Sequence, residues 1–261
     1  MLTYRSPAKI NLFLRVMGKR ADGYHEISSL FQAIGLCDVM TFRMSEQDKF
    51  TCDDPSLPKD DSNLVIKALK LFREKTGRYF PVEIDLQKKI PAQAGLGGGS
   101  SNAATTLYAL NKMIGTPFSE EQLKAWGSEI GSDVPFFFST GTALCEGRGE
   151  KVTSKPPLTS FSIDLHRPNF GLSTPSVYQA LDLTRASQKS PEELLVSFYN
   201  GQPELVNDLE TAAFSLKPEL KQYKDALLKT GSALMSGSGS SFFTLNGPYQ
   251  ALYRSPGEWY H

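Results

Sequence analysis

Residues 91–104 read PAQAGLGGGSSNAA, and this glycine-rich stretch restricts the possible folds more than any other part of the sequence. Before it, residues 82–86 alternate apolar and polar side chains as a strand does; after it, apolar residues recur at helical spacing as far as Gly115. A strand, a glycine loop and a helix therefore follow one another. Successive free N–H groups at a helix start form a concave anion site, reinforced by about half a positive charge from the helix dipole.

The loop differs from two familiar phosphate motifs. No lysine follows the glycines as the Walker pattern requires, and Ser100 stands where the dinucleotide fingerprint needs its last glycine. Ser100 and Ser101 lie where hydroxyl groups cap a helix, and they could bind its first-turn amides, a phosphate or a phosphate-bound magnesium. A flexible turn closed by a serine cap is the alternative interpretation of the same residues.

Charge and cysteine content limit the class of protein. The 261 residues include 28 Lys or Arg and 28 Asp or Glu, so the formal net charge is zero and neither nucleic acid nor a membrane is an expected partner. Cys37, Cys52 and Cys145 are widely spaced, which predicts neither a disulfide framework nor a zinc site. Without a signal-peptide pattern or a long apolar run, we expect a cytoplasmic protein. The oligomeric state stays open.

The order of the expected elements indicates an α+β fold in two domains, residues 1–154 and 155–261. Strands are predicted over residues 8–16, 24–36, 39–44 and 82–86, helices over 64–76 and 120–130, and two or three short strands within 135–152. The second domain begins with a strand over 161–168 and continues with helices around Val177 and from Pro191, Pro203 and Pro218. It closes with a second glycine-rich turn over residues 235–243.

The strand over residues 8–16 has one face that differs from an ordinary core strand. Lys9, Asn11, Phe13 and Arg15 share this face, while the other is entirely apolar. Lys9 and Asn11 thus form a polar pair above a hydrophobic layer. A lysine that protects an edge strand from aggregation is the alternative interpretation of Lys9.

Five motifs occur in the order and spacing of the galactokinase, homoserine kinase, mevalonate kinase and phosphomevalonate kinase superfamily. They are SPAKINLFL, RADGYHEI, the glycine loop, GSDVPFF and SGSGSSFF. Within the superfamily, the sequence most resembles the family of 4-diphosphocytidyl-2-C-methyl-D-erythritol kinases, from Ser6 to about Phe243. The resemblance implies an N-terminal domain like the second domain of ribosomal protein S5, a ferredoxin-like C-terminal domain and an active site in the cleft between them.

The same resemblance implies ATP-dependent phosphorylation of the 2-hydroxyl of 4-diphosphocytidyl-2-C-methyl-D-erythritol, in non-mevalonate isoprenoid precursor biosynthesis. Asp133 matches the family's catalytic aspartate, which orients the hydroxyl and takes its proton, and Lys9 matches its lysine partner. A solvated loop carboxylate is the alternative for Asp133. The family leaves Mg²⁺ mainly to the ATP phosphates, so no metal ligand is expected in the protein. The residues expected to bind ATP are Pro91, Ala92, Gln93, Ala94, Gly95, Leu96, Gly97, Gly98, Gly99, Ser100 and Ser101.

For the cytidine diphosphate substrate, the resemblance implies an aromatic site. Tyr24 is expected to stack on the base, His25 to contact its polar edge, and Tyr178 to cover the other face. Ordinary helix packing is the alternative for Tyr178 and a helix cap for its neighbour Thr174. The expected substrate-binding residues are Asn11, Tyr24, His25, Thr174, Tyr178, Gly237 and Gly239.

Two features depart from the family pattern. Gln93 and Ala94 replace glycine or another small residue, and a positive φ at Gln93 would cost about 1 kcal/mol or more. After Phe243 the sequence is shorter than is usual in the family, so we expect a shortened second domain. The alternative functions are another alcohol kinase of the superfamily and a catalytically silent nucleotide or metabolite sensor.

Overall fold

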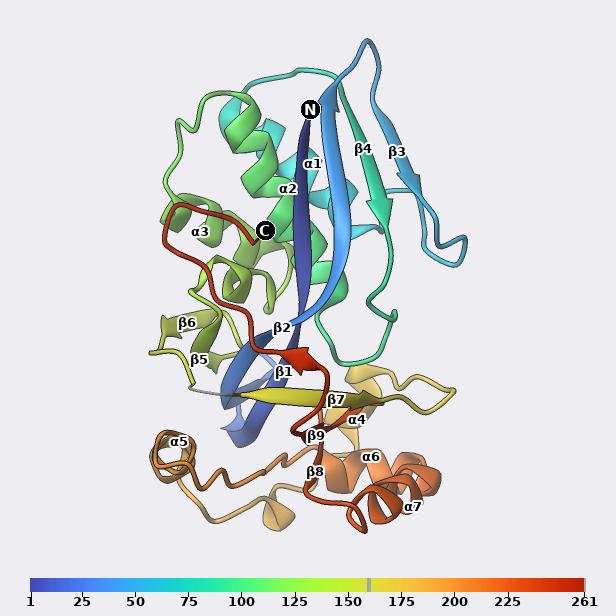
Figure 1. Ribbon diagram of the computed structural model, residues 1–261, viewed down its shortest axis with the longest axis vertical. Coiled ribbons are helices and arrows are strands. Elements are labelled where there is room, and N and C mark those ends of the chain that lie inside the picture. Colours follow the sequence, from blue (N-terminus) through green and yellow to red (C-terminus); the bar gives the residue numbers. More distant parts are fainter. Residues whose placement is uncertain (159–160, 261) are drawn as a thin grey trace.

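Two β-sheets form the upper and lower halves of the molecule (Figure 1). The computed structural model describes residues 1–158 and 161–260. The first sheet contains β1 (Leu2–Lys19), β2 (His25–Met44), β3 (Lys49–Cys52), β4 (Val82–Gln87), β5 (Thr142–Gly147) and β6 (Lys151–Ser154). The second contains β7 (Ser162–His166), β8 (Ala233–Met235), β9 (Phe242–Leu245) and β10 (Tyr249–Gln250). Strands and helices mix without regular alternation, and the predicted α+β class is confirmed.

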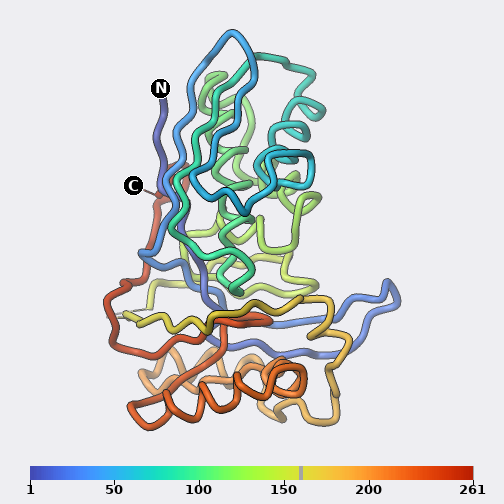
Figure 2. The backbone as a smooth tube through the Cα atoms, turned by 90° about the vertical axis from the view of Figure 1, so that its right-hand side faces the viewer, coloured from blue at the N-terminus to red at the C-terminus, as the bar shows by residue number. Residues whose placement is uncertain are grey.

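The long strand β2 organises the first sheet. It pairs antiparallel with β1 along one edge, and with β5 and β4 in succession along the other. Strand β3 adds parallel to β4, and β6 adds antiparallel to β5. Strands β1 and β2 continue below the rest of this sheet, and their hairpin projects from the molecule in Figure 2. The two halves therefore share β1, which carries Lys9, and β2, which begins directly after Tyr24.

The helices of the first half cover one face of the first sheet, as Figure 2 shows. They are α1 (Leu64–Thr76), α2 (Gly98–Met113) and α3 (Glu120–Ile130), followed by the 3₁₀ helix η1 (Val134–Phe138). Residues next to α1 and α3 fix the ends of these two helices. Gly77 ends α1 with φ 64°, and Ser119 with Gln122 forms the capping box of α3. Apolar side chains of these helices and the first sheet form one continuous buried cluster.

The second sheet has the order β10-β7-β9-β8, with all neighbours antiparallel. The helical segments of the second half are α4 (Thr174–Gln179), η2 (Leu183–Arg185), α5 (Pro191–Tyr199), α6 (Glu210–Leu216) and α7 (Pro218–Leu227). After β10 the chain leaves this half and runs up along the first (Figure 1). There Trp259 is buried and stacks on Tyr108, with ring centroids 4.6 Å apart. The last residues thus stabilise the first half.

The two or three short strands predicted within residues 135–152 correspond to β5 and β6, and the 3₁₀ helix η1 precedes them. One predicted element of secondary structure is wrong. The helix expected from Pro203 does not form, and α6 begins only at Glu210. The backbone at Val206 accepts a hydrogen bond from Leu14 of β1 instead. Pairing with a distant strand thus overrides the local helix signal.

The expected polar face of β1 also extends less far than predicted. The pairing with β2 shifts register between Asn11 and Phe13, so alternation is interrupted there. Phe13 packs in a buried cluster with Ile10 and Leu12, and Arg15 forms an ion pair with Asp208. Only Lys9 and Asn11 remain together as a polar pair.

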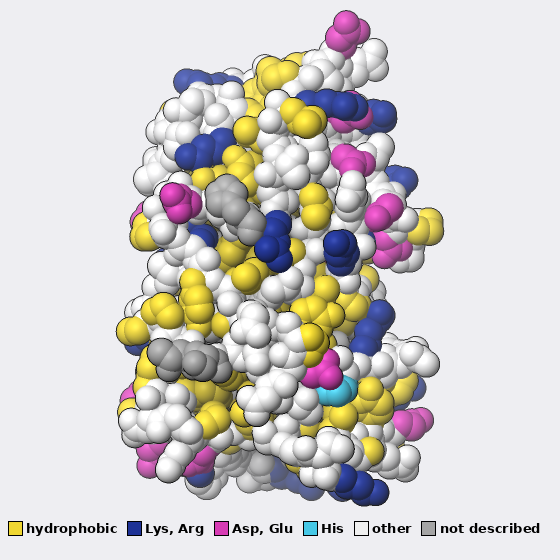
Figure 3. Space-filling view, in the orientation of Figure 1, with side chains coloured by type: hydrophobic (Ala, Val, Ile, Leu, Met, Phe, Trp, Pro, Cys, Tyr) yellow, Lys and Arg dark blue, Asp and Glu magenta, His cyan; other side chains and the backbone are white. Residues whose placement is uncertain are grey.

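Charges of both signs are dispersed over the face in Figure 3, with neither sign gathered into one patch. Within residues 1–158 and 161–260, no helix combines the length and the apolar composition needed to cross a membrane.

Candidate active site

The glycine loop enters α2 through main chain alone. Gly97 is the N-cap, with φ 69°, and no side chain in the described part of the chain caps this helix. The predicted capping by Ser100 or Ser101 is wrong, because the helix already begins at Gly98 and the serines lie inside its first turns. No side chain therefore caps the main-chain amides at the positive end of the α2 dipole, where the glycine loop joins the helix.

Close packing explains why glycine is required at two loop positions. A Cβ on Gly95, where φ is 74°, would lie 2.2 Å from the carbonyl oxygen of Ser236. A Cβ on Gly97 would lie 2.8 Å from Cγ of Lys9. The expected positive φ at Gln93 is present, at 52°, and costs about 1 kcal/mol or more for a residue with a side chain. The loop thus packs closely between β1 and the second glycine-rich turn.

A cavity of about 760 Å³ lies along the loop. Its walls come from the loop, from the segment before α1 and from the end of β4. Asn63, which caps α1 by accepting a hydrogen bond from the Val65 amide, lines it, as does Lys88. Lys88 is the one charged side chain lining this cavity in the described ranges. The loop residues on its wall are Pro91, Ala92, Gln93, Ala94, Gly95, Leu96, Gly97, Gly98, Gly99 and Ser100.

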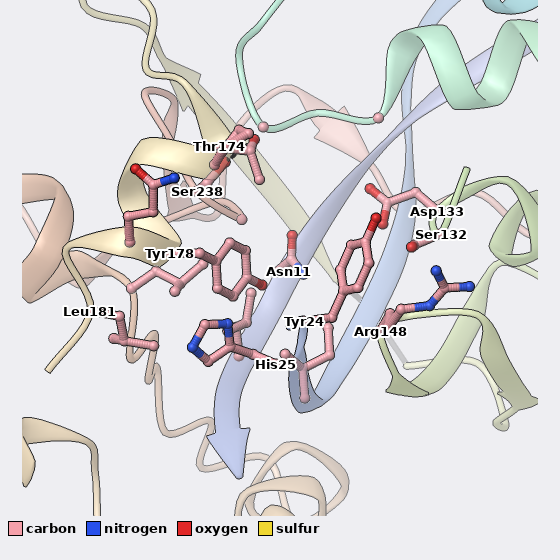
Figure 4. Close-up of a pocket in the computed structure, with 18 of the residues that line it drawn as sticks. Asn11, Tyr24, His25, Ser132, Asp133, Arg148, Thr174, Tyr178, Leu181 and Ser238 are labelled. Atoms are coloured by element: carbon pink, nitrogen blue, oxygen red, sulfur yellow. Dashed lines mark hydrogen bonds between the residues drawn. The ribbon is translucent and has the colours of Figure 1, made fainter. Parts of the chain in front are cut away.

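A second cavity, of about 830 Å³, adjoins the first, and Gly95, Gly97 and Thr174 line both. Figure 4 shows how its walls are arranged. Asn11 of β1 lies between one side formed by Tyr24, Asp133 and Arg148 and another formed by His25 and Tyr178. The two cavities have the dimensions of ligand sites and meet at the end of the glycine loop.

Lys9 and Asp133 lie together at this junction. The Lys9 ammonium is 3.4 Å from Oδ2 of Asp133 and donates a 2.6 Å hydrogen bond to Oδ1 of Asn11. The Asn11 amide in turn donates to Ser29, which fixes its orientation. The Lys9 side chain is 4% exposed and that of Asp133 is 32% exposed, so the carboxylate opens to the cavity while its partner is buried. The arrangement can orient a hydroxyl group and stabilise negative charge on it.

His25 and Tyr178 lie on one side of the second cavity, and Tyr24 lies on the side that carries Asp133 (Figure 4). His25 and Tyr178 stack on each other, with centroids 5.1 Å apart and planes at 28°. Tyr24 is 55% exposed, and the guanidinium of Arg148 lies 5.1 Å from its ring. Burial, and secondly the charge of Lys19, lowers the pKa of His25, while burial raises the pKa of Tyr178. A neutral imidazole beside the Tyr178 ring suits a planar, uncharged ligand ring.

Comparison with known proteins gives a consistent result. The model of the GHMP kinases N terminal domain matches residues 63–141, and that of the GHMP kinases C terminal domain matches residues 189–250. The chain is 55% identical to the 4-diphosphocytidyl-2-C-methyl-D-erythritol kinase of Protochlamydia amoebophila, over 92% of this chain and 83% of the relative. It is 41% identical to the enzyme of that name from Carboxydothermus hydrogenoformans, over 92% of this chain and 86% of the relative.

A crystal structure of 4-(cytidine 5'-diphospho)-2C-methyl-D-erythritol kinase superposes with a TM-score of 0.78 at 34% identity, covering 96% of this chain and 90% of the other. The chain belongs to the 4-diphosphocytidyl-2-C-methyl-D-erythritol kinase family. A homoserine kinase from Cytophaga hutchinsonii shares the fold at 21% identity, with a TM-score of 0.66 and 94% and 84% of the two chains covered. Membership of the family makes this chain an ATP-dependent small-molecule kinase.

Two residues expected in the sites of this family member lie outside the cavities. Ser101 is fully buried, and its hydroxyl accepts a hydrogen bond from Ser6 instead of facing the phosphate-loop cavity. Gly239 packs against Met235 and Leu172, and its neighbour Ser238 lines the second cavity. The other expected catalytic and substrate-binding residues all line the second cavity, namely Lys9, Asn11, Tyr24, His25, Asp133, Thr174, Tyr178 and Gly237.

Lys88, Arg148 and Ser238 line the cavities although the sequence did not single them out. Lys88 directly follows β4 and precedes the glycine loop, so it does not stand at the Walker position after the glycines. Arg148 lies in the turn between β5 and β6, where an arginine between two glycines looks like an ordinary surface turn. Ser238 forms a 2.7 Å hydrogen bond with Thr174. Its position between the motif glycines Gly237 and Gly239 was the sequence feature that could have predicted Ser238 as a site residue.

Proposed function

We propose that this chain transfers the γ-phosphoryl group of ATP to the 2-hydroxyl of 4-diphosphocytidyl-2-C-methyl-D-erythritol, the substrate that the names of its relatives give. One observation carries the proposal. The Lys9–Asp133 pair lies at the junction between a cavity bordered by a helix N-terminus and a cavity bordered by aromatic rings. A donor phosphate and an acceptor alcohol can meet there.

Phosphoryl transfer requires mainly positioning and charge stabilisation. The carboxylate of Asp133 accepts the proton as the acceptor oxygen forms its bond to the γ-phosphorus. The bond from that phosphorus to the β,γ-bridging oxygen breaks, and ADP leaves with the electron pair. The ammonium of Lys9 faces the same region and stabilises the negative charge that develops on the oxygen atoms.

The nucleotide site is expected at the glycine loop. Helix α2 begins at Gly98 without a side-chain cap, so the first main-chain amides of the helix are available to bind a phosphate. Mg²⁺, bound mainly by the ATP phosphates, would neutralise part of their charge. Ser100 is the loop hydroxyl available to it, because Ser101 is buried.

The base of the acceptor is expected among Tyr24, His25 and Tyr178. Aromatic rings and a neutral imidazole provide stacking and hydrogen bonds for cytosine, whereas homoserine and mevalonate have no ring to stack. Arg148, next to the exposed ring of Tyr24, adds a positive charge that suits the diphosphate. These residues therefore support a cytidyl substrate within the larger kinase class.

A coupled assay of ADP release tests the proposal. We expect turnover with 4-diphosphocytidyl-2-C-methyl-D-erythritol, and none above background with homoserine or mevalonate at the same concentration. Equal activity on an alcohol without cytidine would contradict the specificity. ATP binding without turnover on any of the three would favour a silent sensor.

A further inference from the structure

Asp38, in the middle of β2, lines neither cavity and is completely buried, with 0% exposure. A carboxylate inside a protein is stable only when it is paired and hydrogen-bonded. The donors around Asp38 come from both ends of the glycine loop. No step of the proposed reaction uses this residue, so its contacts call for a separate explanation.

The first set of donors lies where the chain enters the loop. Oδ1 of Asp38 accepts hydrogen bonds from the amides of Lys89, at 2.7 Å, and Ile90, at 2.8 Å. These two residues directly precede the loop, which starts at Pro91. Oδ2 forms an ion pair with the ammonium of Lys88. The last residues before the loop are therefore tied to β2 by main chain and by charge.

The second set of donors lies where the chain leaves the loop. Oδ2 of Asp38 also accepts a 2.9 Å hydrogen bond from the side-chain amide of Asn102, in the second turn of α2. The same amide donates to the Ser6 hydroxyl at 2.9 Å, and Ser6 donates to Ser101 at 2.8 Å. Ser6 is the partner of Asp38 in the β1–β2 register. One carboxylate thus connects the loop entrance, the loop exit and the central strands.

We propose that Asp38 is a positioning residue for ATP, which holds the glycine loop in its binding conformation before the nucleotide arrives. The loop needs such support because it contains strained backbone at Gln93. Asp38 also directs Lys88, whose ammonium lies 3.4 Å from the place that a Cβ on Gly98 would occupy. The inference rests on the proposed function only in taking ATP as the ligand of the loop.

The expected effect follows from the population of the competent loop. If the loop without this link adopts its binding conformation about one tenth of the time, the dissociation constant for ATP rises about tenfold. Most of the acceptor cavity is lined by residues outside the loop, such as Tyr24, His25 and Tyr178, so the acceptor is expected to keep its affinity within about twofold. A residue needed for general stability alone would affect both ligands through the unfolded fraction.

Asp38→Asn keeps the size of the side chain while it removes the charge and replaces one acceptor oxygen by a donor. Asp208→Asn is the matched control. Asp208 is also buried, pairs with Arg15 at 2.8 Å, and accepts hydrogen bonds from the amides of Val16 and Ser187, but it has no contact with the glycine loop. Both substitutions therefore disturb a buried ion pair and two main-chain hydrogen bonds.

Calorimetric titration of the full chain with MgATP, without acceptor and below the melting temperatures of both variants, is the test. We expect the dissociation constant to rise about tenfold in Asp38→Asn and less than about twofold in Asp208→Asn. Equal changes in the two variants, or unchanged affinity in folded Asp38→Asn, would overturn the proposal. Because no acceptor is present, absence of turnover on the cytidyl substrate would count against the proposed function and not against this inference.

Asn102→Ala provides the second variant if Asp38→Asn does not fold. It removes the hydrogen bonds of the Asn102 side chain with Asp38, Ser6 and Lys88 but leaves the contacts of Asp38 at the loop entrance, and alanine is favourable within a helix. An increase of about three- to fivefold in the dissociation constant for MgATP is expected, with little change in melting temperature. Unaltered ATP affinity in Asn102→Ala would equally overturn the role assigned to Asp38.

Discussion

Gly95→Ala tests the contact between the two glycine-rich segments. The new Cβ would lie 2.2 Å from the Ser236 carbonyl oxygen and 3.1 Å from that of Gly239, so the segments must separate. Separation breaks two hydrogen bonds, from the Ser236 hydroxyl to the Gly95 carbonyl and from the Ser241 amide to the Ala94 carbonyl. Each hydrogen bond contributes about 1 kcal/mol, and alanine at φ 74° costs about 1 kcal/mol. The closed arrangement, in which the two glycine-rich segments are in contact, is therefore destabilised by about 3 kcal/mol.

A change of that size lowers the population of the closed arrangement, and with it the ATP affinity, by about a hundredfold. Calorimetric titration with MgATP measures this affinity, and thermal unfolding shows whether the chain is folded. Gly115→Ala is the control, since φ is 87° there and no atom lies within 4 Å of the added Cβ. It is expected to lose about 1 kcal/mol of stability and to bind ATP normally. Equal ATP affinities in the two folded variants would refute the reasoning.

Two further predictions concern the acceptor end of the site. Because burial lowers the pKa of His25, the imidazole is expected to stay neutral down to below about pH 6.5. The KM for the cytidyl substrate is expected to rise only in more acidic solution, because protonation of His25 places a charge beside Tyr178. His25→Gln should remove this rise from the pH profile of KM, and an unchanged profile would exclude His25 as its origin. Tyr24→Ala is expected to raise the same KM about ten- to a hundredfold through lost base stacking and to leave the KM for ATP unchanged. Tyr79→Ala, at another exposed tyrosine, is the control, and an equal response in steady-state kinetics would contradict the role of Tyr24.

The end of α1 and the start of α3 were predictable from the sequence because these caps depend on a few neighbouring residues. Gly77 and the capping box of Ser119 lie where the sequence places them. The segment after Pro203 was not predictable, since its conformation depends on pairing with Leu14, far away in the chain. The register shift after Asn11 in β1 likewise follows from pairing with β2, and no local sequence pattern predicts it.

The same distinction holds for the candidate site. Lys9 and Asp133 belong to separate motifs, and only the family resemblance predicted that they would meet; the structure brings them within 3.4 Å. Asp38 carries no motif and looks like an isolated charge in an extended segment. Its link to the glycine loop depends on how the end of β4 and the start of α2 fold against β2. Tertiary contacts of this kind leave no signal in local sequence.

The central claim is that the Asp133 carboxylate takes the proton of the acceptor alcohol beside Lys9. Measurement of kcat for Asp133→Asn with saturating ATP and cytidyl substrate, together with MgATP affinity by titration, tests it most directly. We predict that kcat falls at least about a hundredfold, the usual contribution of a positioned general base, while ATP affinity changes less than about twofold. A kcat within about threefold of that of the unchanged protein would contradict the claim.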